Sequence, residues 1–88
     1  MKRILVIGIA GREQFVGDVR YLQSYDVDAA GGRGVVKLTT DRKRAMLFSS
    51  HETAWAAWSM QSSVQPLRDD GKPNRPLTAY NVIIEEAV

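Results

Sequence analysis

The sequence predicts a small α+β domain in which one main helix covers one face of a small, mostly antiparallel sheet. Two strongly apolar, β-branched runs stand near the two ends of the chain. A segment with alternating polarity follows the first run, and one segment with helical spacing precedes the second. The order strand–strand–strand–helix–strand is typical of a helix packed on a sheet. Residues 1–88 are expected to form a single domain, because a chain of this length cannot form two cores.

The first and the last strand are expected to be the central ones, because they are the most apolar. Residues 4–9 read Ile-Leu-Val-Ile-Gly-Ile and predict a strand that is buried on both faces. Residues 79–86 predict the last strand, with Tyr80, Val82 and Ile84 on one face. The sequence leaves open whether these two strands run parallel or antiparallel, since the segment before the last strand is long enough for either.

Residues 19–25 and 35–39 are predicted to pair as a hairpin around the turn-prone stretch 26–34. Strict alternation along the first arm places Leu22 on the opposite face from Tyr25. The predicted order of the strands across the sheet is therefore 35–39, 19–25, 4–9 and 79–86.

The main helix is expected to begin at a capping box formed by Ser49 and Glu52 and to run to about Ser62. One stripe of this helix at 3.6-residue spacing should face the sheet. It consists of His51, Ala54, Trp55, Trp58 and Ser62. A shorter helical turn, capped by Thr40 or Asp41, is expected before it, with Ala45 facing inward.

Composition excludes several classes of chemistry. Without cysteine, the chain has no disulfide framework, zinc–thiolate site or thiol nucleophile. A formal net charge of +2 is too small to indicate a nucleic-acid-binding charge density. The apolar run near the start is shorter than a membrane helix. We expect no membrane association, no cofactor and no bound metal, and a monomer or weak homodimer.

Three motifs suggest catalysis or ligand binding, and each is incomplete. Gly8 and Gly11 match part of a dinucleotide fingerprint, but the third glycine and a long helix are missing. Asp26 and Asp28 begin a calcium-loop pattern that ends on a lysine, so a turn with backbone-accepting aspartates is preferred. His51 is the single histidine, and a general base needs partners that the sequence does not supply. A small enzyme of unknown type stays an alternative, with no catalytic residue assigned.

Basic residues in the middle of the chain support another alternative, a nucleic-acid-binding protein. Arg33 lies in a Gly-Gly-Arg-Gly stretch, Lys37 follows it, and Arg42–Arg44 form a basic trio. If the fold joined them, they would form a phosphate-binding patch whose affinity falls steeply with salt.

The segment at about 64–78 holds all three prolines and is the most unusual part of the sequence. Asp69-Asp70-Gly71 predicts a turn, and the residues before the prolines are restricted to extended geometry. Such a stiff loop presents side chains at low entropic cost. We predict that it binds a partner through Arg68, Lys72, Asn74 and Arg75. Leu67 and Leu77 are expected to anchor the loop.

Several blocks of the sequence resemble a family of short, uncharacterised proteins of bacteriophages and prophages. The blocks are residues 21–28, Gly32-Arg33-Gly34, Thr40-Asp41 with Ala45 and Phe48, Trp58, and above all residues 68–80. The resemblance implies a phage setting and the cytoplasm of a bacterial host. It carries no activity, ligand or site residue. Together with the stiff loop, it leads us to expect an accessory protein that acts by binding a macromolecule, in the first place a protein, without catalysis.

Overall fold

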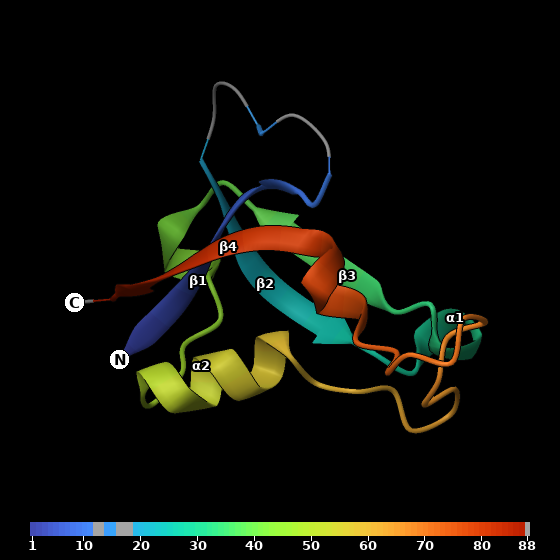
Figure 1. Cartoon of the computed structure of the whole chain (residues 1–88). Coiled ribbons are helices and arrows are strands. Elements are labelled where there is room, and N and C mark those ends of the chain that lie inside the picture. Colours follow the sequence, from blue (N-terminus) through green and yellow to red (C-terminus); the bar gives the residue numbers. More distant parts are fainter. Residues whose placement is uncertain (12–13, 16–18, 88) are drawn as a thin grey trace.

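Four antiparallel strands form one sheet in the computed structural model, which describes residues 1–11, 14–15 and 19–87 (Figure 1). The strands are β1 (Lys2–Ile9), β2 (Arg20–Asp26), β3 (Val35–Thr39) and β4 (Tyr80–Glu86). Their order is β3-β2-β1-β4, which confirms the predicted α+β class and strand order. The expectation that the last strand is central is wrong, because β4 pairs only with β1 in this order and lies at the edge of the described sheet. β4 runs antiparallel to β1, in the direction that the sequence left open.

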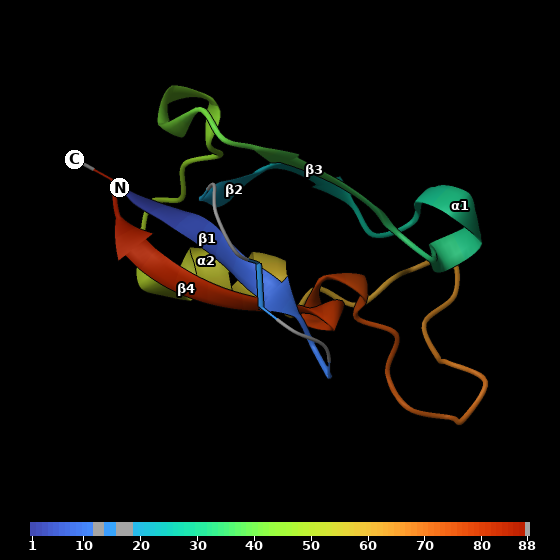
Figure 2. The same cartoon turned by 90° about the horizontal axis from the view of Figure 1, so that it is seen from above.

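The main helix, α2 (His51–Trp58), packs on one face of the sheet and contacts β1 and β4 (Figure 2). Beneath it lies a core of mostly aliphatic side chains contributed by every layer of the fold. The core consists of Ile4, Val6, Leu22, Val27, Ala54 and Leu77. Burial on both faces of β1, as predicted, is wrong. Only the face of Ile4 and Val6 is fully buried, and Leu5 and Ile7 on the other face are half-buried, because α2 covers one side of the sheet.

Among the described residues, β1 and β2 pair at Leu5 with Tyr21 and at Val6 with Arg20. Nearer the start of β1, a third segment takes the place of β2 beside the strand. Lys2 and Phe48 exchange two backbone hydrogen bonds of 2.7 Å each, and the Met46 amide donates to the Leu22 carbonyl at 2.8 Å. The segment is held by backbone groups that would otherwise be left unpaired. Ala45, just before it, is buried as predicted.

A β-bulge in β2 corrects the predicted alternation of the hairpin. The pairing with β3 shifts between Leu22 and Ser24, so that two residues of β2 oppose one of β3. Leu22 and Tyr25 therefore pack on the same core. The predicted separation of these two side chains was wrong, because an inserted residue reverses the phase of every later position.

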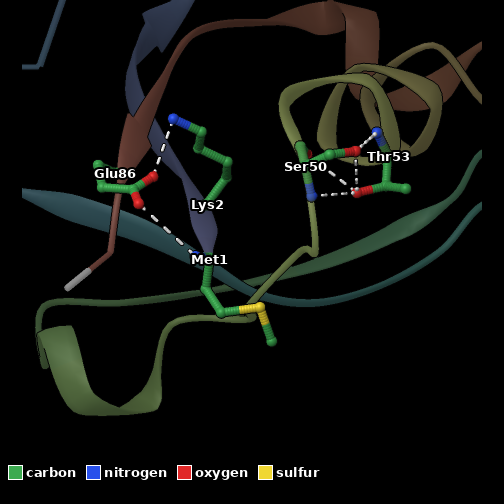
Figure 3. Close-up of polar contacts among 5 residues, drawn as sticks. All are labelled: Met1, Lys2, Ser50, Thr53 and Glu86. Carbon is green, nitrogen blue, oxygen red and sulfur yellow. Dashed lines mark hydrogen bonds and ion pairs between the residues drawn. The ribbon is translucent and has the colours of Figure 1, made fainter.

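The helix α2 is shorter than predicted and begins one residue later. Its N-cap is Ser50, whose hydroxyl accepts from the Thr53 amide at 3.2 Å, while the Ser50 amide donates to the Thr53 hydroxyl at 3.0 Å (Figure 3). The predicted box of Ser49 and Glu52 is thus wrong by one position. The helix ends at Trp58 rather than Ser62, and the Ser59 hydroxyl caps the Trp55 carbonyl at 2.8 Å.

The two ends of the described chain lie side by side, where the start of β1 pairs with the end of β4 (Figures 1 and 3). The Lys2 ammonium lies 2.8 Å from the Glu86 carboxylate, and the Met1 amino group lies 3.7 Å from it. The bond from Lys2 lowers the pKa of Glu86. In the described ranges, no helix is long and apolar enough to cross a membrane.

Candidate functional site

The proline segment contains a small β-hairpin of its own. The Asn74 amide donates to the Pro66 carbonyl at 2.9 Å and the Arg68 amide to the Lys72 carbonyl at 2.7 Å. Asp69-Asp70-Gly71 forms the turn, as predicted, with Gly71 at φ 83° closing a hydrogen bond to Arg68. This is the three-residue hairpin loop in which a left-handed glycine follows a type I turn. The segment therefore holds a defined shape through its own backbone.

The anchors of this segment differ from the predicted pair. Leu77, in the 3₁₀ turn Pro76–Ala79, is only 2% exposed and belongs to the core, which confirms its predicted role. Leu67 is 54% exposed, so its predicted role as an anchor is wrong. It pairs with Pro73 across the hairpin rather than with the body of the protein.

The Asp28 carboxylate, in the turn between β2 and β3, takes the place of the missing apolar anchor. It accepts hydrogen bonds from the Ser62 hydroxyl at 2.9 Å, the Ser63 amide at 2.7 Å and the Ser63 hydroxyl at 2.8 Å. The Val64 amide adds a fourth at 3.3 Å. These bonds fix the start of the proline segment to the turn between β2 and β3. They also explain why Ser62 is buried although it lies outside the helix.

Asn74 supplies a second connection between the same two segments. Its side-chain amide donates to the Gly32 carbonyl at 2.6 Å and to the Gln65 carbonyl at 2.9 Å. Its backbone carbonyl accepts from the Ser62 amide at 2.8 Å. The structure thus commits Asn74 to holding the loop in place, whereas the sequence suggested a group free to meet a partner.

Close packing at Gly32 makes this contact sensitive to a single methyl group. Gly32 has a φ of 95°, and an added Cβ would lie 2.6 Å from the Gln65 Cβ and 3.3 Å from the Asn74 amide nitrogen. Gly31 has a φ of 69° but faces open space. We expect Gly31→Ala to lower stability by about 1 kcal/mol through backbone strain alone. Gly32→Ala should cost about 1–3 kcal/mol more through overpacking, measured by urea unfolding. Equal costs for the two variants would show that the loop moves aside freely.

The charge on Asp28 makes the loop contact dependent on pH. Hydrogen bonds from the Ser63 hydroxyl and amide, and then from Ser62, hold the pKa of Asp28 below its ordinary value of 3.8. The ionised carboxylate therefore stabilises the fold above that value, and the stabilisation is lost as pH falls through the lowered pKa. The urea midpoint should drop on acidification more steeply in the wild type than in Asp28→Asn. Parallel curves would show that Asp28 contributes nothing through its charge.

Two adjoining grooves lie where the hairpin meets the turn between β2 and β3. The inner groove has a volume of about 570 Å³, and the residues that line it include Arg33, Gln65, Arg68, Asp69, Asp70 and Asn74. The outer groove has a volume of about 440 Å³, and the residues that line it include Arg33, Arg68, Pro73, Asn74, Arg75 and Thr78. Arg33, Arg68 and Asn74 line both grooves, which makes the two one continuous surface.

The arginines of this surface come from two segments that are far apart in the sequence. Arg33 follows the short helical turn α1 (Ala29–Gly32), while Arg68 and Arg75 belong to the proline segment. Three of the four predicted binding residues, Arg68, Asn74 and Arg75, therefore line the grooves, whereas Lys72 is not among the described lining residues. Sequence reasoning assigned Arg33 to a different site. Its neighbouring glycines were the available signal, because they allow the close approach of the two segments.

The cations of the predicted nucleic-acid patch are spread along β3 and do not lie close together. Arg33 lies beside α1, while Arg42–Arg44 form a 3₁₀ turn at the opposite end of the sheet (Figures 1 and 2). β3 separates them, with Lys37 near its middle, and a strand of this length spans roughly 17 Å. Asp41 caps the basic turn through the Lys43 amide at 2.9 Å and lies 3.7 Å from Arg44.

The residues considered for catalysis or ligand binding lie at separate places in the fold: Gly8 in β1, Asp28 in the turn between β2 and β3, and His51 at the start of α2. His51 is exposed at the start of α2, beside a shallow groove lined by Glu52 and Trp55. The pKa of Glu52 is lowered by hydrogen bonds to its carboxylate from the backbone amide of Glu52 itself and from the Ser50 side chain. After β1, residues 14–15 return alongside the strand, with the Phe15 amide donating to Ile7 at 2.8 Å. Within the described ranges, no group of His, Asp and Glu side chains is arranged to hold a metal ion.

Comparison with models of known protein families, with curated proteins and with solved structures found no match for this chain. The fold and the grooves define a small α+β domain with an arginine-lined surface at one end of its sheet. The function has to be inferred from that surface and from the contacts that hold it.

Proposed function

We propose that this protein is a small, non-enzymatic accessory protein that binds another protein through the surface formed by Arg33 and the proline segment. The observation that carries the proposal is the convergence of Arg33, Arg68 and Arg75 on two adjoining grooves. Arginine is enriched among the residues that dominate binding energy at protein interfaces. A binding surface made of exposed arginines on a fixed loop is therefore the strongest functional feature of the fold.

The rigidity of the loop supports this proposal. Asp28 and Asn74 join the proline segment to the turn between β2 and β3 through side-chain hydrogen bonds. The proline segment also forms a small backbone hairpin of its own. A surface that is already ordered loses little conformational entropy on binding. The polar anchors therefore have a function beyond stability, since they hold the walls of the grooves in position.

The lining of the grooves favours a protein over a nucleic acid as the partner. Asp69 and Asp70 lie in the inner groove and would repel a continuous phosphate backbone. No aromatic ring is among the described residues that line either groove, so bases have no stacking platform there. The basic trio at the far end of the sheet is too distant to extend the same surface.

The test is an affinity pull-down with the intact chain and with a variant carrying Arg68→Ala, Lys72→Ala and Arg75→Ala. The resemblance to phage proteins makes a nuclease-treated lysate of a bacterial host the appropriate material. We expect mass spectrometry to find a protein that the wild type enriches and the triple variant does not. Arg42→Ala is the matched control, since it removes an exposed arginine from the opposite end of the sheet, and it should retain capture.

The stability of the variants decides how the result is interpreted. Each exposed cation should change the free energy of unfolding by no more than about 0.5 kcal/mol, as at ordinary surface positions. If the triple variant unfolds, or if it captures the same protein as the wild type, the proline segment is not the binding surface. Capture that occurs only from a parallel lysate without nuclease treatment would point to nucleic acid and contradict the proposal.

A further inference from the structure

The outer groove has the chemistry of a site for carboxylate groups. We infer that it binds acidic side chains of an extended segment in the partner protein. This inference rests on the proposed function and specifies the partner's chemistry. Arg33, Arg68 and Arg75 line the outer groove, and no acidic residue is among its described lining residues. Guanidinium groups are permanently charged and bind carboxylates through two parallel hydrogen bonds.

The charge of the outer groove is only partly neutralised within the chain. Arg68 forms an ion pair with Asp70 at 3.3 Å. Among the described residues, neither Arg33 nor Arg75 takes part in an ion pair. Two guanidinium groups from different segments are thus available on the same groove. A partner segment whose carboxylates contact both Arg33 and Arg75 would join the turn between β2 and β3 to the proline segment. It would thereby add to the contacts that Asp28 and Asn74 already make.

The inner groove gives the bound segment a direction. Asp69 and Asp70 line it together with the amide side chains of Gln65 and Asn74. Arg33 and Arg68 line it as well, so two aspartates balance two arginines, and Asp70 is already paired with Arg68. The inner groove therefore has no excess of positive charge and suits a neutral or basic residue better than an acidic one. Since Arg33 and Arg68 belong to both grooves, a segment crossing the surface meets Arg75 on one side of them and the two aspartates on the other. The fitting sequence therefore places acidic residues in the outer groove, followed by polar or basic residues in the inner one.

The experiment measures fluorescence anisotropy with short labelled peptides and the intact chain. We expect a peptide of Glu and Ser to bind, and a matched peptide with Gln for each Glu not to bind. Affinity should fall as salt increases, because exposed charges are screened. A peptide with Glu at one end and Lys at the other should bind more tightly than one with Glu throughout. A random peptide of the same composition should lose that gain.

Variants locate the binding in the groove. Arg33→Ala and Arg75→Ala should each weaken binding of the Glu peptide roughly tenfold, as expected when a hydrogen bond to a charged group is lost. Arg75→Lys keeps the charge but loses the paired hydrogen bonds, so its affinity for the Glu peptide should lie between that of the wild type and that of Arg75→Ala. Arg42→Ala should leave binding unchanged, and all variants should share the urea midpoint of the wild type.

Three results would overturn the inference. The first is equal weakening by Arg42→Ala and Arg75→Ala, which would mean attraction to net charge alone. The second is tighter binding of an oligothymidylate than of the Glu peptide, with the same dependence on Arg75. The third is absence of binding to any acidic peptide while capture from lysate still depends on Arg75. That last result would leave the proposed function standing and reject only the acidic segment.

Discussion

Trp58→Ala is expected to lower the free energy of unfolding by about 3 kcal/mol, a large share of the roughly 4–13 kcal/mol available to a domain of this size. The Trp58 ring packs against the core, and its indole N–H donates to the Tyr80 carbonyl at 3.1 Å. The substitution removes apolar burial and leaves the carbonyl at the start of β4 without this donor. Urea unfolding followed by circular dichroism measures the effect.

Trp55→Ala is the matched control, because Trp55 lies on the same helix and is 53% exposed. Its ring meets that of Trp58 at a centroid distance of 4.8 Å, so its removal should cost about 1 kcal/mol or less. If the two substitutions cost the same, α2 does not face the sheet as described.

Leu77→Ala should cost about 3 kcal/mol, within the range measured for buried leucines. Its side chain is almost fully enclosed and holds the 3₁₀ turn before β4 against the core. Removing it leaves a cavity between this turn and the sheet. The loss should appear as a lower urea midpoint with an unchanged slope, because the extent of unfolding stays the same.

Leu67→Ala makes the same chemical change at an exposed position, and we expect an effect within about 0.5 kcal/mol. The pair thereby separates the apolar anchor of the proline segment from the residue that sequence reasoning also placed there. Comparable losses for both leucines would mean that Leu67 packs against the body of the protein in solution.

The elements of the fold were predictable because their signals are local or periodic. Apolar runs mark β1 and β4, and the turn residues at 26–34 mark the hairpin of β2 and β3. The boundaries were less predictable. The helix was expected to continue to Ser62, yet Ser62 bonds to Asp28, and a distant carboxylate overrides a continuous helical pattern. The bulge in β2 gave no signal, since one inserted residue leaves the composition of a strand unchanged.

The candidate surface was predictable in part for a similar reason. Proline and turn chemistry identified the loop and its exposed cations Arg68, Lys72 and Arg75. The role of Asn74 as an anchor was hidden, because its partners Gly32 and Gln65 are defined only by the folded chain. Arg33 joined the surface for the same reason. An exposed side chain has no periodicity that relates it to a segment far along the sequence.

The sequence alone was enough to predict the α+β class, the four strands and their order, the single covering helix, and a stiff turn at Asp69-Asp70-Gly71. The strands, the helix and the turn depend on patterns within a few residues. The folded chain was needed to show which side chains hold the proline segment and which arginines share its grooves. The contacts of Asp28 with Ser62 and Ser63, and of Asn74 with Gly32, join residues more than thirty positions apart. Their geometry exists only after the sheet has brought the segments together.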